Sequence, residues 1–289
     1  MISPFFSVSK RQKLFVFLLL APCIAALLGL IGYPYLQLLY MSTFEEGQFA
    51  PAIYLDTVTD PYFFRAFLVS LIFTAVSVAG TTLLGLGMAF LLDVGWKGEK
   101  LFRTIFLIPL MTPTVVSAVG WKILFHPTFG LVDYLLSLVG IPAVDFLGSS
   151  QTALWSVLLV NIWINFPFPL LVFSAALKAF PIEPFESARI DGASTWEVFR
   201  YLSFPLLRPI LLLVIIFRTV WSFQEFEEIY ILTGGGPGTS SLNLYVLAFF
   251  KSFLWYRMSV GSAIIVIMFI IVAIASGIYI IILRRSALR

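Results

Sequence analysis

Charged side chains are scarce in this sequence. They make up 11% of its 289 residues, whereas hydrophobic residues make up 60% and aromatic residues 17%. A soluble domain has about 25% charged and about 45–50% apolar residues. The composition therefore excludes a disordered chain, a soluble globular enzyme and a free nucleic-acid-binding protein. It predicts a protein whose solvent is largely membrane lipid.

Cysteine and histidine are almost absent as well. The single cysteine, Cys23, excludes a disulfide framework, and the single histidine, His126, lacks partners for a metal site. Paired carboxylates, Cys–His pairs and Ser–His–Asp triads at catalytic spacing are missing too. The glycine run at residues 234–236 lacks the Gly-Lys-Ser/Thr ending of a phosphate-binding loop. We therefore expect neither an enzyme nor a metal or cofactor bound by this chain.

Long hydrophobic runs, in contrast, are abundant. A helix needs about 20 apolar residues to cross a bilayer, and lipid leaves no backbone group unsatisfied, so helices are the expected spanning structure. Five runs carry no charge, and a sixth is apolar apart from Arg218 and three glutamates. The sequence predicts an all-α integral membrane protein with six transmembrane helices, at residues 14–40, 66–92, 104–121, 152–177, 209–232 and 258–283.

The lysines and arginines predict the orientation, because cytoplasmic segments of membrane proteins carry the excess of basic residues. With six spans, 13 of the 18 basic residues fall on one side, 4 fall on the other, and Arg218 lies within a span. Both termini are therefore expected in the cytoplasm. Residues 1–13 would be a cytoplasmic N-terminal segment, and residues 14–289 a single transmembrane domain.

The expected cytoplasmic segment at residues 181–209 is unusually organised. Residues 183–190 favour a helix that has a proline in its first turn. Gly192 permits a turn that other residues adopt less easily. Ser194 and Glu197 have the spacing of a capping box, which predicts the start of a second helix. Prolines are expected to end that helix and begin the next span, at Pro205 and Pro209.

The same segment resembles the EAA loop of permeases of binding-protein-dependent ABC importers, which are proteins of the prokaryotic inner (plasma) membrane. Its acidic residue, small pair, Asp-Gly-Ala and downstream prolines match that motif, and the one departure is Ser187, where alanine is usual. The resemblance implies a coupling helix that docks into a separate ATPase subunit, which holds ATP and Mg. It assigns this contact to Glu186, Ser187, Ala188, Asp191, Gly192 and Ala193. For Asp191, local capping of the turn is an alternative.

A second stretch narrows the resemblance. Residues 232–241, followed by Tyr245, Phe249 and Phe250, are similar to the loop after the fifth span in sugar permeases of the maltose and glycerol-phosphate type, specifically the first permease of the heterodimer. The resemblance implies the type I importer fold and transport by alternating access. The implied partners are a second sugar permease, two ATPase subunits, an extracytoplasmic substrate-binding protein and a sugar, with no nucleic acid.

Polar and aromatic side chains within two predicted spans indicate where the sugar would lie. Charge inside a membrane is costly, so these faces are expected to meet an interior rather than lipid. Carbohydrates are bound by amides, carboxylates and aromatic rings, and the family's substrate contacts fall at matching positions. Two sets follow helical spacing: Asn161, Asn165 and Phe168 in the fourth span, and Arg218, Trp221, Ser222 and Glu225 in the fifth. Second-rank candidates are Phe223, Gln224, Glu227 and Glu228, the last two expected near the outer end.

Alternatives stay open at this point. The two asparagines could join helices by hydrogen bonds, and Arg218 could pair with Glu225 or with a carboxylate of the partner permease. The same machine could carry an amino acid, a polyamine or a metal instead of a sugar. A secondary transporter or channel would need no ATPase and would leave residues 181–209 without a purpose. The residues do not distinguish a disaccharide, an oligosaccharide or glycerol phosphate.

Overall fold

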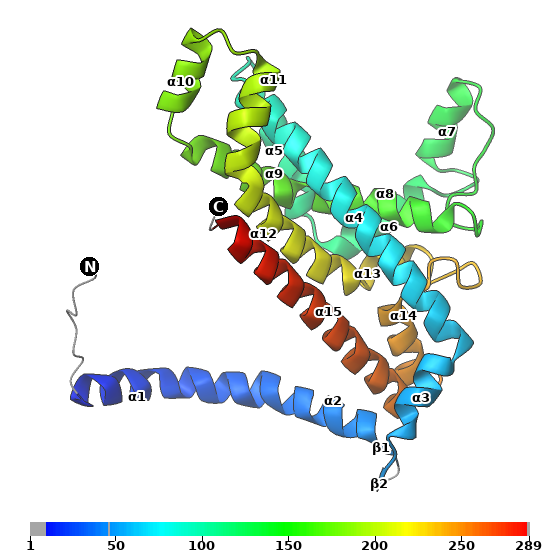
Figure 1. Cartoon of the computed structure of the whole chain (residues 1–289). Coiled ribbons are helices and arrows are strands. Elements are labelled where there is room, and N and C mark those ends of the chain that lie inside the picture. Colours follow the sequence, from blue (N-terminus) through cyan, green and yellow to red (C-terminus); the bar gives the residue numbers. More distant parts are fainter. Residues whose placement is uncertain (1–9, 46, 288–289) are drawn as a thin grey trace.

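The computed structural model describes residues 10–45 and 47–287, and helices dominate it (Figure 1). The first part comprises α1 (Lys10–Leu27), the π-helix η1 (Leu28–Gly32), α2 (Tyr33–Thr43), a short antiparallel pair β1 (Phe44–Glu45) and β2 (Gln48–Phe49), α3 (Ala52–Thr59), α4 (Pro61–Asp93), α5 (Glu99–Met111), α6 (Thr114–Leu124) and α7 (Leu131–Leu138). The second part comprises α8 (Ala153–Asn165), α9 (Pro167–Ala179), α10 (Glu183–Ile190), α11 (Thr195–Val198), η2 (Phe199–Ser203), α12 (Phe204–Phe223), α13 (Glu227–Leu232), α14 (Leu244–Phe249), η3 (Phe250–Leu254) and α15 (Met258–Ala287).

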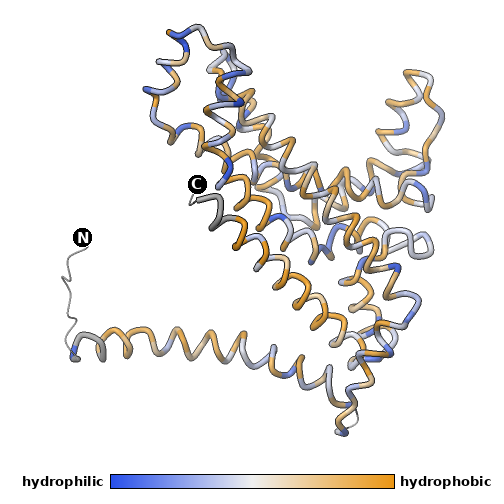
Figure 2. The backbone as a smooth tube through the Cα atoms, viewed as in Figure 1, coloured by the Kyte–Doolittle hydropathy of each residue, from blue (hydrophilic) through white to orange (hydrophobic). Residues whose placement is uncertain are grey.

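Five helical stretches of the described chain are long and apolar enough to cross a membrane. They are Phe15–Thr43, Pro61–Asp93, Ala153–Ala179, Thr195–Phe223 and Met258–Ile282. Hydrophobic residues follow these helices, whereas hydrophilic residues gather at their ends and around α10 (Figure 2). The predicted helical architecture, with helices long and apolar enough to cross a membrane, is therefore confirmed.

The predicted third span is not a straight helix. Its residues belong to α5 and α6, which meet at 100°. The break falls at Thr112, whose backbone is extended, directly before Pro113. A residue that precedes proline is disfavoured in the helical region, and proline itself offers no N–H to continue the ladder. The pair can form one broken span or a re-entrant loop.

The predicted fifth span, residues 209–232, is wrong at both ends. The helix begins at Thr195 and runs through η2 and α12 to Phe223. Pro205 does not stop it, because this proline lies in the first turn of α12, directly after a π-helical turn that loosens the regular ladder. At the other end the helix stops before three glutamates, and α13 is a separate short helix.

The turn at residues 191–194 confirms the local predictions for its segment. Gly192 has φ of +80°, a left-handed conformation that favours glycine. The Ser194 hydroxyl accepts from the Glu197 N–H, and the Glu197 carboxylate accepts from the Ser194 N–H at 2.8 Å, which is the reciprocal capping box. The two predicted helices, α10 and α11, therefore flank a turn fixed by its own sequence.

Helix α4 is the centre of the bundle and packs against α9 and α12. The contact with α9 depends on Gly85, because a Cβ there would lie 2.6 Å from Pro169 Cβ and 2.8 Å from the Leu170 backbone nitrogen. Next to this contact, Ala89, Phe166, Phe173 and Leu207 form part of one hydrophobic core cluster. Helix α15 packs against α12 on the other side.

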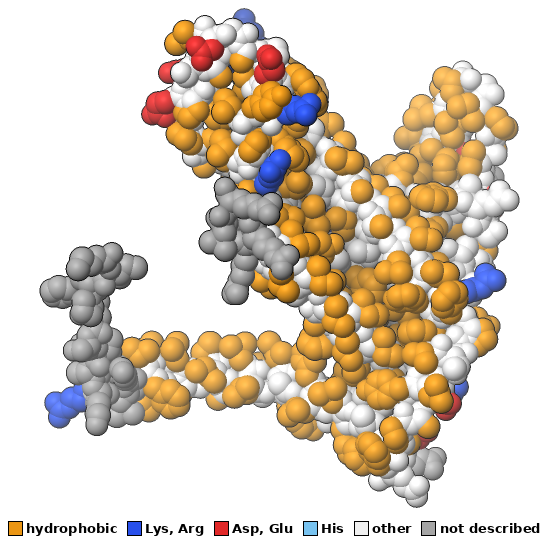
Figure 3. All heavy atoms as spheres, in the orientation of Figure 1, with side chains coloured by type: hydrophobic (Ala, Val, Ile, Leu, Met, Phe, Trp, Pro, Cys, Tyr) orange, Lys and Arg blue, Asp and Glu red, His pale blue; other side chains and the backbone are white. Residues whose placement is uncertain are grey.

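The N-terminal helices form an arm that leaves this body (Figure 1). The arm comprises α1, η1 and α2 and meets the body where α2 packs against α15 and α3. None of residues 15–40 is buried within the chain. Hydrophobic side chains cover the visible side of the arm (Figure 3).

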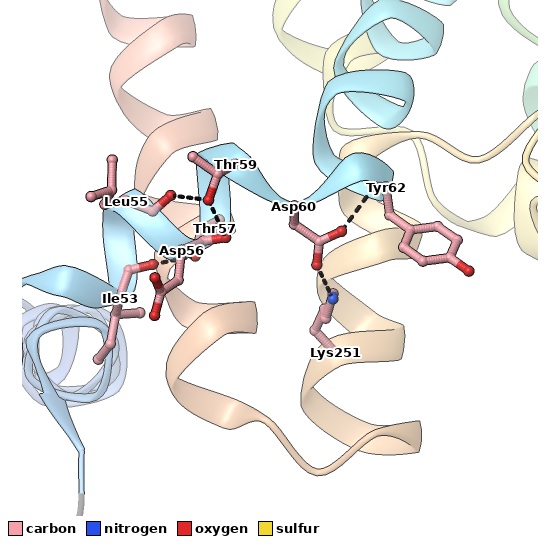
Figure 4. A network of polar contacts seen from close by, with 8 residues as sticks. All are labelled: Ile53, Leu55, Asp56, Thr57, Thr59, Asp60, Tyr62 and Lys251. Carbon is pink, nitrogen blue, oxygen red and sulfur yellow. Dashed lines mark hydrogen bonds and ion pairs between the residues drawn. The ribbon is translucent and has the colours of Figure 1, made fainter.

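An ion pair joins α4 to the segment before α15 (Figure 4). Asp60 precedes α4 and accepts from the Tyr62 N–H at 2.8 Å with one carboxylate oxygen, and its other oxygen binds the ammonium group of Lys251. Lys251 is buried, and its ammonium group also lies 4.7 Å from the centre of the Trp255 ring. The pair thus connects residues far apart in the sequence.

Candidate functional site

Arg218 lies inside the helix bundle, on α12, with 1% of its surface exposed. Its guanidinium group donates four hydrogen bonds to side chains of α4, α8 and α12. The acceptors are Thr81 Oγ1 at 3.2 Å, Asn165 Oδ1 at 2.8 Å, Ser77 Oγ at 3.1 Å and Ser222 Oγ at 3.2 Å. A buried charge requires such partners, because transfer out of water is costly. Arg218 therefore joins α12 to α4 and α8.

Glu228, on α13, is the acidic counterpart and is likewise 1% exposed. Its carboxylate accepts from Asn161 Nδ2 at 2.6 Å and from Asn165 Nδ2 at 3.1 Å. Asn161 Oδ1 in turn accepts from Ser77 Oγ at 2.5 Å. Glu228, expected near the outer end of the span, is buried, because α13 folds against α8 and α6 and carries this side chain inward.

A polar cleft of about 330 Å³ opens beside this network. It lies where α12 ends and α13 begins, next to the first residue of α6 and the last residue of α8. Three of its side chains are carboxylates, and we call it the acidic cleft. Its lining residues are Thr114, Asn165, Gln224, Glu225, Phe226, Glu227, Glu228 and Tyr245. The cleft combines carboxylates, amides, a hydroxyl and aromatic rings, which is the chemistry that binds sugars.

An aromatic cluster lies one turn before the cleft. The Trp221 ring centre is 4.9 Å from that of Phe168 and 5.7 Å from that of Phe217. Trp221 is 46% exposed, so the rest of this chain leaves about half of its surface accessible to another molecule. Trp221 lies on the last turn of α12, and Gln224 and Glu225 of the acidic cleft follow directly after that helix ends.

The structure divides the seven predicted substrate residues into three groups. Asn165 and Glu225 line the acidic cleft. Phe168 and Trp221 lie in the aromatic cluster. The remaining three are buried within the bundle, at 2% exposure or less, so no surface is left for a sugar to touch: Asn161, Arg218 and Ser222. For the asparagines, hydrogen bonding between helices, which was the alternative reading, is observed.

Several residues of this region were not predicted. Ser77 and Thr81 are four residues apart on α4, and this helical spacing of two hydroxyls in an apolar run was the available signal. Thr114 and Tyr245 reach the cleft only because α5 and α6 bend sharply and α14 packs back against α4. Pro113 is a local sign of the bend, but the sequence gives no local sign that α14 packs against α4.

Residues 181–193 form a separate, exposed site at another end of the bundle. Glu186, Ser187, Asp191 and Gly192 are exposed, and Ala188 and Ala193 are half-buried. Within the described chain the Asp191 carboxylate makes no hydrogen bond, so local capping of the turn is not observed. Ile190 is 86% exposed between these polar residues. Acidic side chains gather over α10 on the face shown in Figure 3. This surface has the polar and apolar groups of a docking site.

Comparison with known proteins identifies the class. The family model of the binding-protein-dependent transport system inner membrane component matches residues 81–288. The trehalose/maltose transport system permease protein MalF of Thermococcus litoralis is 33% identical over 272 residues, which is 91% of each chain. The sulfoquinovosyl glycerol transport system permease protein SmoG of Agrobacterium fabrum is 30% identical and covers 95% of this chain and 92% of its own length.

The fold agrees with this assignment. A chain of a bacterial ABC transporter involved in the import of the acidic polysaccharide alginate superposes with a TM-score of 0.88 at 20% identity, over 95% of this chain and 96% of that one. The protein therefore belongs to the inner membrane components of binding-protein-dependent transport systems, the permease subunits of ABC importers. It is a transport subunit and not an enzyme, since ATP hydrolysis in this family resides in separate subunits.

Proposed function

We infer that this chain is a permease subunit for an uncharged di- or oligosaccharide, which an extracytoplasmic binding protein delivers. Alternating access would move the sugar past the acidic cleft and the aromatic cluster. The observation that carries the proposal is the position of this surface, at a helix break in the middle of an apolar bundle. Polar groups inside an apolar membrane bundle are costly, and they are typical of a transport path.

Within this surface, Glu225 is the main candidate for hydrogen bonding to sugar hydroxyls, with Gln224 and Glu227 beside it. Asn165 lines the cleft, although its amide is already bonded to Arg218, Glu228 and the Asn161 carbonyl oxygen. Trp221 and Phe168 would stack on the apolar face of the sugar ring. Arg218, Asn161 and Ser222 would act behind this surface rather than on it.

The charge of the acidic cleft narrows the class of sugar. Among its described lining residues are three carboxylates and no lysine, arginine or histidine. Arg218 does not change this, because it is buried and donates to other side chains. Glu225 and Glu227 form no ion pair among the described residues, so an anionic sugar would meet like charge from these two carboxylates, which is destabilising in a medium of low dielectric. The neutral sugars named for the Thermococcus litoralis relative therefore fit better than the acidic polysaccharide of the solved importer.

We assign coupling to residues 181–209 and place them in the cytoplasm, in agreement with the distribution of basic residues. The exposed groups of α10 and the turn at Gly192 would dock into an ATPase subunit. The helix that follows the turn is continuous from Thr195 to Phe223 and ends directly before the acidic cleft. A shift at the docking surface would therefore reach the sugar path through a single helix.

A second sugar permease and two ATPase subunits complete the proposed assembly. The arm formed by α1, η1 and α2 supports a partner permease, since its apolar surface is not covered by this chain. Each of the two permeases would contribute one coupling segment, which accounts for two ATPase subunits.

The test is sugar-stimulated ATP hydrolysis by the complete importer in liposomes with its binding protein. Maltose, trehalose and maltotriose would be compared with a uronic-acid oligosaccharide, an amino acid and a polyamine. We expect a neutral sugar to raise the hydrolysis rate at least fivefold and the anionic oligosaccharide to have no effect. If only the amino acid or the polyamine stimulates ATP hydrolysis, the chain imports that solute and the sugar proposal is wrong. Sugar transport without any ATPase subunit would contradict the proposal of an ATP-driven importer.

A further inference from the structure

Glu228 is a buried carboxylate that touches no cation directly. Among the described residues no lysine, arginine or histidine forms an ion pair with it. Both its oxygens are bound by amides of α8, those of Asn161 and Asn165. A buried charge needs more than neutral partners, because the loss of hydration is large. The buried cation of the same hydrogen-bond network, Arg218, reaches it through a neighbour.

Asn165 is that neighbour. Its Oδ1 accepts from Arg218 Nη1 at 2.8 Å, while its Nδ2 donates to Glu228 Oε1 at 3.1 Å. An amide carries an acceptor and a donor on opposite sides, so one Asn165 side chain meets the cation and the anion at once. Asn161 makes a longer second route, through the Ser77 hydroxyl that also accepts from Arg218. Arg218 and Glu228 thus balance each other across amides rather than by contact.

This bridge spans the break between α12 and α13. Arg218 lies on α12 before the break, and Glu228 lies on α13 after it. Between them, Glu225 Oε1 accepts from the Glu228 N–H at 3.3 Å, and the Glu225 carbonyl oxygen accepts from the Asn243 amide. The segment that carries the main candidate sugar ligand is therefore held on both sides.

We propose that Arg218, Asn165 and Glu228 are positioning residues of the importer. They form an amide-bridged charge pair that fixes residues 224–226 to the end of α12, so that Glu225 moves with α12. The proposal rests on the proposed function, because it assigns Glu225 to the sugar path. Its physical basis is that α12 is continuous with the helix that starts at Thr195, and that the same guanidinium group anchors α12 to Ser77 and Thr81 of α4.

The first test compares Arg218→Met, Glu228→Gln and the double variant in the complete importer. Each single variant leaves one buried charge without its counterpart, and the double variant removes both. We expect each single variant to lower the maximal sugar-stimulated ATPase rate at least tenfold, with the sugar concentration for half-stimulation changed less than twofold. The double variant also loses the anchor of α12 on α4, so it should stay below the wild-type rate but exceed both single variants at least threefold. The probe is maltose, or the panel sugar that stimulates the wild type most.

Two comparisons separate positioning from binding and from general stability. Glu225→Ala should raise the half-stimulating sugar concentration at least fivefold, whereas Arg218→Met should mainly lower the maximal rate. Thr81→Val removes the acceptor of Arg218 Nε and should lower the maximal rate two- to fivefold. Thr82→Val is its matched control, since the neighbouring Thr82 hydroxyl is buried without a hydrogen-bond partner among the described residues. The control should retain the wild-type rate.

Two outcomes would overturn the proposal. If Arg218→Met mainly raises the half-stimulating sugar concentration, Arg218 touches the sugar. If the double variant is no better than the single ones, the two charges do not balance each other. Where a single variant fails to assemble with the ATPase subunits, recovery of assembly in the double variant decides the same question. If no sugar stimulates the ATPase rate of the wild type, the proposed function fails. The charge pair is then tested by thermal unfolding, and a double variant with a higher melting temperature than both single variants supports it.

Discussion

The ammonium group of Lys251 binds the carboxylate of Asp60, although the two residues are 191 positions apart in the chain (Figure 4). The side chains are only 6% and 16% exposed. The same carboxylate caps the first turn of α4 through the Tyr62 N–H. One aspartate therefore begins a central helix and anchors the segment that leads into α15.

Lys251→Met should destabilise the subunit because it leaves the Asp60 carboxylate without its cation. Removal of one partner from a buried pair costs about 3–5 kcal/mol, and the partial exposure of Asp60 favours the lower end. The measurement is thermal unfolding of the purified importer in detergent. Lys178→Met is the control, since Lys178 is 56% exposed and lies 3.9 Å from Glu99. It should cost less than about 1 kcal/mol. Equal losses in the two variants would contradict the importance of the buried pair.

Gly85→Val should disturb the contact of α4 with α9. The added Cβ would fall within 3 Å of Pro169 and of the Leu170 backbone, and a backbone atom cannot move aside as a flexible side chain can. Overpacking of this kind costs about 1–3 kcal/mol or more. Gly87→Val is the matched control on the same helix, because nothing lies within 4 Å of its Cβ position. Thermal unfolding should separate the two variants, and a similar melting temperature would refute the close contact.

Gly192→Pro should abolish sugar-stimulated ATP hydrolysis while the subunit still inserts into the membrane. Proline fixes φ near −65° and has no N–H, whereas Gly192 has φ of +80° and donates to the Arg189 carbonyl oxygen at 3.2 Å. The control is Gly140→Pro, at a position with φ of +76° whose N–H donates to the Ser137 carbonyl oxygen at 3.1 Å. The same distortion outside residues 181–209 should leave coupling in place. Normal stimulation in the Gly192 variant would remove this turn from the coupling mechanism.

Trp221→Ala should weaken the response to sugar, because it removes the exposed ring beside the acidic cleft. Loss of one stacking contact of about 1 kcal/mol corresponds to about a fivefold rise in the half-stimulating sugar concentration. Trp155→Ala is the control, since Trp155 is 56% exposed on α8 and does not line the cleft. A dose–response curve of the ATPase rate measures both. An unchanged curve for the Trp221 variant would place the sugar elsewhere.

Short-range chemistry explains which parts of this fold could be predicted from sequence. Apolar runs without charge locate the long helices, and the capping box at Ser194 and the left-handed turn at Gly192 follow from local residue types. Proline was a weaker guide. Pro113 marks a 100° break, whereas Pro205 lies within a continuous helix, because the π-helical turn before it absorbs the strain.

The candidate site was predicted less completely because its partners come from distant helices. Helical spacing placed Arg218 and Glu225 on one face, yet Arg218 donates to an amide of α8 and to hydroxyls of α4 and α12 rather than to the Glu225 carboxylate. Glu228 is buried because α13 folds back, and that fold-back depends on contacts with α6 and α8. The termini, the six-span topology and the coupling contacts stay predictions.

The arm has a consequence for the order in which the chain assembles. Its α2 packs mainly on α15, which begins at Met258, so the arm meets its main partner within the chain only after the intervening helices have been synthesised. At about 5–20 residues per second, the intervening stretch takes on the order of 10 to 40 seconds to emerge. Throughout that interval α2 has α3 but not α15 to pack against, so the apolar surface of the arm is available to any neighbour that arrives before α15.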